Sequence, residues 1–294
     1  MATFASSNFS YTAYASFRPE YPQKLYDMVF SYHQGAYNTC LDLGCGHGLV
    51  SRALSPRFKK VYGIDPSAGM IEQAKNMTTE QNVEFVQAAA ESLPFIEDKS
   101  VDLVVAGVAA HWFNYPPLFA ELQRVMKPGG TLAFWGYSDH YLVDYPKATA
   151  VLDKYAYGLD KDLLGSYWTQ PGNSIMRESL RAIQPPTDQW ADIQRIEYQP
   201  GLNGPDSGKG TKYMETEITL RQATEYIRTW SAYQRWKDAH PGQLRRSEGG
   251  TGDVADEMLD SMIKAEDSLR DVQSAEDKVV KIEWASALIL GRKL

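Results

Sequence analysis

Short apolar runs in the first half of the chain alternate with segments of helical period. The runs predict buried strands at residues 39–43, 60–64, 83–87, 101–106 and 131–137. The segments between them predict helices at residues 49–54, 67–76 and 118–126. Because strands and helices alternate, we expect an α/β fold with a doubly wound, Rossmann-like parallel sheet.

The second half of the chain has a different pattern. It reads as helical but interrupted over residues 145–183, with strands at 190–198 and 282–290 and amphipathic helices at 218–237 and 254–272. We therefore expect one domain, residues 1–294, with a seven-stranded sheet and a helical lid built from insertions. Its parts are an N-terminal cap segment (1–38), a cofactor-binding core (39–140), and lid insertions plus the last two strands (141–294).

Composition narrows the possible partners. The 294 residues include 30 Lys or Arg and 37 Asp or Glu, a net charge of −7, which argues against a nucleic-acid surface. Aromatic residues make up 12% of the chain and suit a small-molecule pocket. The only cysteines, Cys40 and Cys45, form no disulfide framework, so we expect a reducing, cytoplasmic location. No apolar run is long enough to span a membrane. The five histidines lack ligand-like spacing, so we expect no metal. We expect the protein to act as a monomer.

A glycine-rich turn carries the strongest chemical signal. After the first strand, Asp42, Gly44, Gly46 and Gly48 form the pattern D-x-G-x-G-x-G, which differs from the G-x-G-x-x-G dinucleotide fingerprint. Glycines let a ligand approach the backbone closely. Asp65 ends the second strand, where a carboxylate can accept hydrogen bonds from a ribose diol. Together these residues predict a nucleoside-binding site rather than a plain turn.

This constellation resembles the class I S-adenosylmethionine-dependent methyltransferases. The resemblance implies S-adenosylmethionine as the cofactor, with the glycine loop at its methionine end and Asp65 at its ribose. It implies cofactor contacts from Tyr14, Arg18, Asp42, Gly44, Cys45, Gly46, Gly48, Asp65, Pro66, Met70, Ala89, Ala90, Glu91 and Val108. Ala89 departs from the family, in which many members have Asp, so a backbone amide or Glu91 must serve the adenine edge here.

Five phrases spread along the chain resemble the fungal trans-aconitate methyltransferases. They are RPEYP (18–22), AHWF (110–113), WGY (135–137), GSYWTQPG (165–172) and RTWSAY (228–233). The resemblance implies methyl esterification of a small polycarboxylic acid, with trans-aconitate as the substrate and a monomethyl ester as the product. Related branches act on other diacids, including toxic ones, so the resemblance implies the reaction more directly than the acid.

The chemistry of such a reaction fits several residues. A carboxylate is ionised near pH 7, so it needs alignment with the methyl group and exclusion of water rather than a general base. Anchoring a polyanion requires donors, and the planar fork of Arg suits a carboxylate. We expect Arg228 and Arg177 as anchors and His111 as a donor or orienting group. Each has a structural alternative. Arg228 could belong to a solvated stripe, Arg177 could be an ordinary helix-surface arginine, and His111 could be a buried core histidine.

Aromatic and polar residues of the same phrases are the expected substrate contacts. They are Arg18, Trp112, Trp135, Tyr137, Tyr167, Trp168, Gln170, Trp230 and Tyr233. Trp168 and Trp230 could equally be helix-packing residues. One rival function is a methyltransferase for another small acid, a toxin-like diacid or a secondary metabolite. Another is a methyltransferase for a nitrogen or hydroxyl nucleophile, where a hydroxyl would need a base and His111 is the candidate. A non-catalytic module that senses the cofactor and a nicotinamide oxidoreductase also remain.

Overall fold

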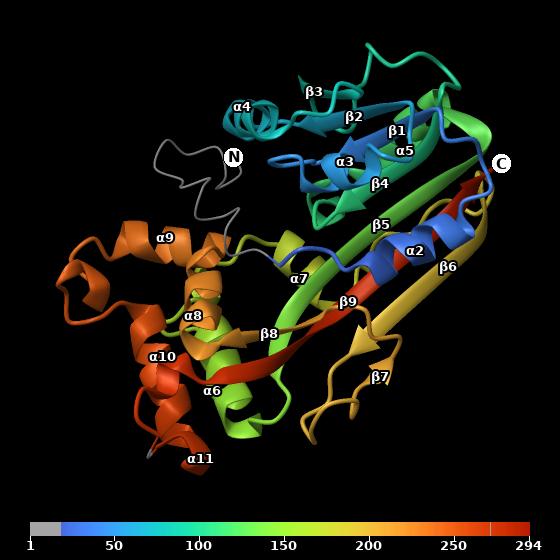
Figure 1. Cartoon of the computed structure of the whole chain (residues 1–294). Coiled ribbons are helices and arrows are strands. Elements are labelled where there is room, and N and C mark those ends of the chain that lie inside the picture. The colour runs from blue at the N-terminus through green and yellow to red at the C-terminus, as the bar shows by residue number, and fades with distance from the viewer. Residues whose placement is uncertain (1–18, 271) are drawn as a thin grey trace. The chain divides into compact units, whose positions relative to one another are not determined.

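The computed structural model describes residues 19–270 and 272–294 of the chain. The strands in these residues are β1 (Thr39–Leu43), β2 (Lys60–Asp65), β3 (Val83–Gln87), β4 (Val101–Gly107), β5 (Met126–Leu142), β6 (Trp190–Gln199), β7 (Lys209–Gly210), β8 (Glu215–Thr219) and β9 (Val279–Lys293). They form a sheet of order β3-β2-β1-β4-β5-β9-β6-β7, with β8 paired to β9 (Figure 1). The doubly wound α/β architecture is therefore confirmed.

The chain divides into two compact units, which are described separately. The core unit comprises residues 20–138, 174–197 and 286–294, and the helical unit comprises the described residues within 139–173 and 198–285. Most of the predicted cofactor-binding core, 39–140, falls in the core unit.

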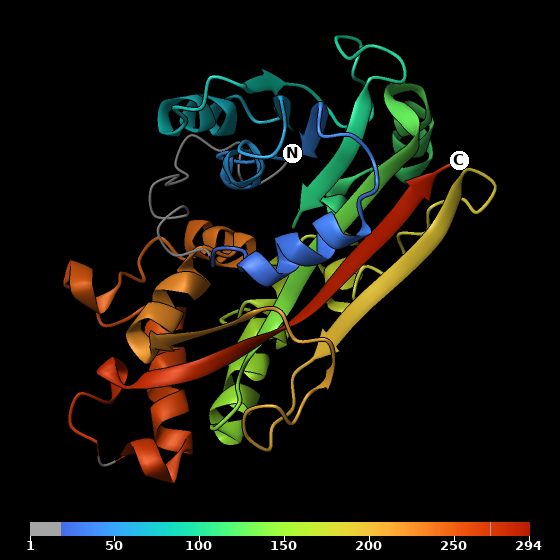
Figure 2. The same cartoon turned by 45° about the vertical axis from the view of Figure 1, so that its right-hand side comes forward.

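Helices flank the parallel strands of the core unit. They are α2 (Gln23–Tyr32), α3 (Leu49–Leu54), α4 (Ala68–Met77), α5 (Tyr115–Val125) and a 3₁₀ turn, Ala110–Trp112. Figure 2 shows α2 and α3 on one side of the strands and α5 on the other. On the α5 side, Leu118 and Leu122 pack in one buried cluster with Val104 and Phe134 of the sheet. Burial on both faces explains why these strands are continuous apolar runs.

The strand order places a ligand site at one edge of the sheet. β1 pairs in parallel with β2 on one side and with β4 on the other, and the connections run in opposite directions from β1. Ligands of doubly wound sheets bind outside the carboxyl ends of the strands at such a reversal. The segments that follow β1, β2, β3 and β4 are therefore the ones that matter for function.

The helical unit contains most of the remaining helices. They are α6 (Pro146–Tyr157), α8 (Leu220–Arg228), α9 (Ser231–Ala239), α10 (Val254–Ala265), α11 (Asp267–Arg270) and 3₁₀ turns at Gly165–Tyr167, Arg246–Glu248 and Ala275–Asp277; α7 (Gly172–Arg177) spans the unit boundary. α10 packs against α6 and α8, and β8 pairs antiparallel with the first part of β9.

Several elements differ from those predicted. The expected helix at 218–237 is two helices, α8 and α9, because Thr219 begins α8 with a capping box and Trp230 adopts an extended conformation before α9. The helix expected at 254–272 ends at Ala265, where the Glu266 carboxylate accepts hydrogen bonds from the amides of Lys147 and Ala148.

The sheet and the N-terminal region also contain elements that were not predicted. The seven predicted strands are all present, and β7 and β8 add two short antiparallel partners. α2 lies in what was predicted only as a cap segment, and it buries Leu25, Tyr26 and Val29. Among the described residues, no helix is long and apolar enough to cross a membrane.

Candidate cofactor and substrate site

The glycine loop after β1 is shaped by three glycines with left-handed backbones. Gly44, Gly46 and Gly48 have φ of 67°, 54° and 83°. A Cβ on Gly44 would lie 2.4 Å from the Cβ of Ala109, so this glycine lets the loop pack against the segment after β4. A Cβ on Gly46 would meet nothing within 4 Å. The loop is therefore packed tightly on one side and has open space in front of Gly46, as a backbone that cradles a ligand requires.

Asp65 links the end of β2 to this loop. Its two carboxylate oxygens accept hydrogen bonds from the backbone N–H of Gly46 (3.0 Å) and of Ser67 (2.8 Å). Burial raises the pKa of the carboxyl, and the two backbone hydrogen bonds oppose that shift. Each oxygen keeps a further lone pair, so Asp65 is oriented by the backbone and can still accept a ribose hydroxyl.

Asp42 is a buried acid with one unsatisfied oxygen. Its Oδ2 accepts a 2.6 Å hydrogen bond from the Ser51 hydroxyl, while Oδ1 has no partner among the described residues. Burial raises the pKa of this carboxyl to about 7, although the hydrogen bond from Ser51 lowers it. A buried acceptor without a partner marks a position that a ligand donor can satisfy.

The other predicted cofactor residues follow β1, β2 and β3. The Cys45 side chain is buried with Ile71 and Phe85, and burial raises the pKa of its thiol, so it is a packing residue of the loop. Met70 is buried in α4, and Pro66, before that helix, is exposed.

After β3, Ala89 is exposed and Ala90 is buried. The Glu91 carboxylate accepts a 2.8 Å hydrogen bond from the backbone N–H of Asn114. Glu91 therefore fixes the start of α5 and keeps further acceptor capacity for the adenine edge.

The carboxyl end of β4 carries a strained backbone beside an unpaired indole. Val108 has φ of 53°, a left-handed conformation that is costly for a β-branched residue, and its N–H donates to the Trp135 carbonyl at 2.8 Å. Trp135 is 1% exposed, and its Nε1–H has no partner among the described residues. The Cβ that Gly107 lacks would lie 3.1 Å from Trp135 Nε1 and 3.1 Å from the Tyr21 hydroxyl.

Further predicted substrate residues surround this edge. Tyr21 packs edge-on against Trp135 at 5.5 Å and lies 6.3 Å from the Tyr137 ring. His111 is buried, with its ring 4.6 Å from that of Trp112, which is 45% exposed. The structure therefore gathers Trp135 and Tyr137 around Tyr21, and it joins His111 to Trp112.

In the helical unit the predicted substrate residues separate into two aromatic groups. Trp168 lies 5.4 Å from Trp230, and its Nε1–H donates to the Ala156 carbonyl at 2.7 Å. Tyr233 instead stacks on Trp236, in a row that continues through a histidine to Tyr167. Gln170 is exposed.

The predicted anchor Arg228 has a different role in the structure. It is 6% exposed, and its guanidinium donates to Asp253 at 2.9 and 2.8 Å, to Asp256 at 2.7 Å and to Glu225. Tyr233 also donates to Asp253, at 2.6 Å. Arg228 joins α8 to α10 at the centre of an ion-pair cluster, and four of its five N–H donors are already bound to carboxylates of the protein.

Three predicted site residues remain: the anchor Arg177, the cofactor contact Tyr14, and Arg18, which was predicted for both cofactor and substrate. Arg177 is exposed at the end of α7. Tyr14 and Arg18 lie outside the described residues.

Two residues of the β4 edge were missed from the sequence. Tyr21 lies within the RPEYP phrase, but the sequence alone indicates no role for it. Gly107 directly follows the strand that the sequence predicts at 101–106. The strand register, in which Gly107 pairs with Trp135, is what identifies Gly107.

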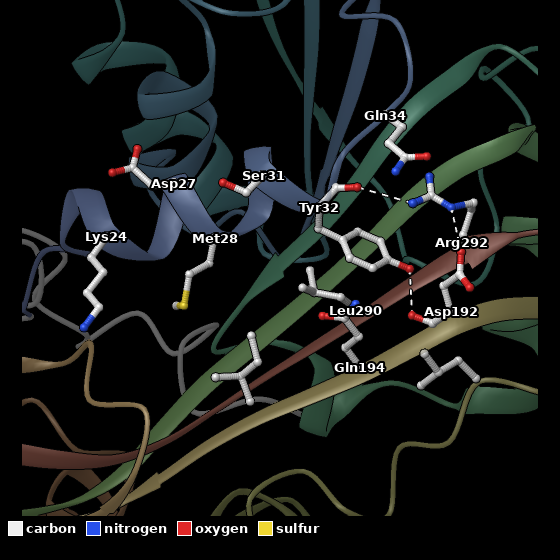
Figure 3. A pocket seen from close by; sticks show the side chains of 12 residues that line it. Lys24, Asp27, Met28, Ser31, Tyr32, Gln34, Asp192, Gln194, Leu290 and Arg292 are labelled. Carbon is white, nitrogen blue, oxygen red and sulfur yellow. Dashed lines mark hydrogen bonds and ion pairs between the residues drawn. The ribbon is translucent and has the colours of Figure 1, made fainter.

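The core unit also contains a groove that is lined by other residues than those of this site. This groove of about 650 Å³ lies along α2, β6 and β9, and none of its lining residues follows β1, β2, β3 or β4 (Figure 3). At one end Arg292 donates to Asp192, and the Tyr32 hydroxyl donates to the Asp192 carbonyl at 2.9 Å. The polar groups at that end are paired with one another, so we do not assign it to the cofactor.

Comparisons with known proteins agree with this geometry. The family model described as a methyltransferase domain matches residues 41–134, which contain the glycine loop and Asp65. The chain is 32% identical over 308 residues to the Probable S-adenosylmethionine-dependent methyltransferase CRG1 of Saccharomyces cerevisiae, covering 99% of this chain and 98% of that protein. The malonyl-[acyl-carrier protein] O-methyltransferase of Marinomonas sp. is 35% identical over 154 residues, which cover 51% of this chain and 56% of that protein.

The fold is shared with solved structures as well. A protein described as a type II methyltransferase from Anaeromyxobacter dehalogenans superposes with a TM-score of 0.67 at 26% identity, covering 94% of this chain and 98% of that one. The fold and the site thus define an enzyme that transfers methyl groups. The chain belongs to the class I S-adenosylmethionine-dependent methyltransferases, and S-adenosylmethionine is its cofactor.

The residues at the sheet edge fit this cofactor. The space in front of Gly46 admits a ligand, Asp65 offers acceptors to a ribose, and the unpaired Asp42 oxygen offers an acceptor to a cationic donor. When bound, the cofactor supplies an electrophilic methyl group. The chain orients the two acids through Gly46, Ser67 and Ser51.

Proposed function

We propose that the enzyme transfers the methyl group to a carboxylate oxygen of a small polycarboxylic acid, and that this acid is trans-aconitate. The products are its monomethyl ester and S-adenosylhomocysteine. The phrases at 18–22, 165–172 and 228–233, which resemble the trans-aconitate methyltransferases, support the choice of acid. The Marinomonas relative supports carboxyl methylation, because the free end of a malonyl group is a carboxylate.

The observation that carries the proposal is the buried, unpaired Nε1–H of Trp135 at the carboxyl edge of the sheet. An indole N–H only donates, and an ionised carboxylate only accepts, so the two are complementary. An amine would bring its own N–H donors to this position. A carboxylate is also its own nucleophile at neutral pH, with a reference pKa of about 4, so the reaction needs no base.

Three other predicted residues belong to this proposal. We keep Trp112 and Tyr137 as walls of the acceptor site and Arg177 as its proposed charge anchor. Arg228 is not part of it, because its guanidinium is already bound by carboxylates.

The proposal is tested by methyl transfer from S-adenosylmethionine to a panel of acceptors. The panel holds trans-aconitate, cis-aconitate, citrate, itaconate, an aromatic amine and a catechol, and the products are identified by mass. We expect a monomethyl ester of trans-aconitate, with a rate at saturating S-adenosylmethionine that does not change above about pH 6. Transfer to the amine or the catechol alone would contradict carboxylate methylation.

A pair of matched variants tests the indole donor. Trp135→Phe keeps the ring and removes the N–H, so we expect kcat/KM for the acid to fall about 10- to 100-fold, as for a hydrogen bond to a charged group, with unchanged cofactor affinity. Trp190 in β6 is the control, because it is also 1% exposed and its Nε1 also has no partner among the described residues. Trp190→Phe should leave kcat/KM unchanged. Equal losses in the two variants would mean that Trp135 acts only through packing.

A further inference from the structure

The helical unit contains a cavity that the methyl-transfer proposal does not use. Its volume is about 300 Å³, and it lies beside β5 and α6. The apolar part of its lining comes from Ala150, Leu152, Ala156, Leu202 and Trp230. Leu202 is 40% exposed, whereas Leu152, Ala156 and Trp230 are buried. All of its lining residues belong to the helical unit.

His140 of β5 lines this cavity and is fully buried. Neither of its ring nitrogens has a hydrogen-bond partner among the residues that the structure describes. Three aromatic rings enclose the imidazole, Tyr226 at 5.3 Å, Trp230 at 5.7 Å and Trp284 at 6.2 Å. A buried polar group in this condition is rare, because burial without a partner forfeits its hydrogen bonds to water.

The charge state of the ring defines what could satisfy it. Burial lowers the pKa of His140 to about 3, so the ring is neutral near pH 7, with one nitrogen donating and the other accepting. The rings that face it are those of Tyr226 in α8, Trp230 just before α9 and Trp284 in β9. The ionisable groups of the cavity lining are Asp139, Asp153, Tyr141 and Tyr157. No Lys or Arg lines the cavity, and its carboxylates disfavour an anion.

We propose that this cavity is a binding site for a small uncharged molecule that carries a hydrogen-bond donor and acceptor on an aromatic or apolar body. The polar group of the molecule pairs with one ring nitrogen of His140, and the body packs against Trp230 and Leu152. An amide has this chemistry. The site does not depend on the identity of the methyl acceptor, so its test is independent of the reaction.

Three isosteric probes test the proposal on the full chain without any methyl acceptor. Benzamide is neutral, benzamidine is a cation and benzoate is an anion, and the three share one shape. Binding is followed by the ¹⁵N shifts of the histidine rings. We expect benzamide to bind with a Kd of about 1–10 mM, as for a fragment of this size, and to shift both ring nitrogens of His140. Tighter binding of benzamidine or benzoate would show that charge, and not the neutral imidazole, selects the ligand, and would overturn the proposal.

Variants separate a ligand site from a packed core. His140→Leu removes both ring nitrogens at similar volume, and we expect benzamide affinity to fall at least about tenfold. His240→Leu is the matched control, because His240 lies in the same unit outside the cavity lining and its Nδ1 already pairs with the Trp236 carbonyl at 2.8 Å. Should His140→Leu fail to fold, the ring shifts of the wild-type protein still decide. Unchanged His140 shifts in saturating benzamide would mean that solvent alone fills the cavity.

Discussion

The role of Arg228 can be decided by one substitution. Arg228→Met keeps most of the length of the side chain and removes the guanidinium that joins Asp253, Asp256 and Glu225. If Arg228 is structural, the variant loses stability and keeps its affinity for the acceptor. If it is a substrate anchor, the variant keeps its stability and its acceptor KM rises.

The expected size of the loss follows from burial. Arg228 is 6% and Asp253 is 1% exposed, so removing the cation leaves a buried acid that keeps hydrogen bonds from Tyr233 and a backbone amide and a longer ion pair, at 3.9 Å, with Arg245. Breaking a buried pair from one side costs about 3–5 kcal/mol. For a unit of this size that corresponds to a lowering of the Tm by roughly 6–20 °C.

The assay compares two arginines of one helix. Thermal unfolding and acceptor KM are measured for Arg228→Met and for Arg221→Met, its counterpart seven residues earlier. Arg221 is 57% exposed and pairs with Glu276 and Asp277 on the surface. An exposed pair of this kind contributes about 0–1 kcal/mol, so the control should unfold close to the wild type.

Arg228→Lys refines the result. Lysine keeps the charge but lacks the planar fork that bonds Asp253 through two nitrogens, so an intermediate stability is expected. A wild-type Tm in Arg228→Met, together with a raised KM for the acid, would refute the structural role. It would restore Arg228 as a substrate anchor.

Three further predictions concern the core unit. Asp65→Ala should weaken binding of S-adenosylmethionine at least about tenfold in calorimetry, because it removes the ribose acceptor, and unchanged affinity would contradict that role. Since burial raises the pKa of Asp42 to about 7, cofactor affinity should increase from pH 6 to pH 8 as the acid ionises. Asp42→Asn should remove this pH dependence, and Ser51→Ala should move the midpoint of the affinity change to higher pH, because it removes a hydrogen bond that lowers the pKa. Gly107→Ala places a methyl group 3.1 Å from Trp135 Nε1, so steady-state kinetics should show a raised acceptor KM with little change in cofactor affinity.

The sequence predicted the cofactor half well because its signals are local. Buried parallel strands are short apolar runs, and a glycine loop needs its residues within a few positions of each other. The strands predicted at 39–43 and 83–87 coincide with β1 and β3, and the helix predicted at 67–76 is α4, shifted by one residue. The glycine loop and Asp65 are joined by a hydrogen bond, as expected of one site.

The helical unit was harder to predict because its boundaries depend on contacts between distant residues. An amphipathic pattern continues through Thr229 and Trp230, so periodicity alone gives one helix where the structure has α8 and α9. Glu266 ends α10 with hydrogen bonds to amides at 147 and 148, which no local pattern reveals. β9 begins at Val279, before the strand start predicted at 282, and the additional residues supply part of the edge that pairs with β8.

The hydrogen-bond partners of the predicted site residues change how each of them is interpreted. Arg228 was chosen because a polyanion needs a cation, but acids on α8 and α10 meet that cation first. Trp135 is a predicted substrate contact, and the structure adds that its indole N–H is a buried donor without an acceptor among the described residues. Charge on a side chain therefore says little about ligand binding until its partners are known. An unpaired buried donor or acceptor is the stronger signal, because the folded chain bears its cost unless a ligand or water relieves it.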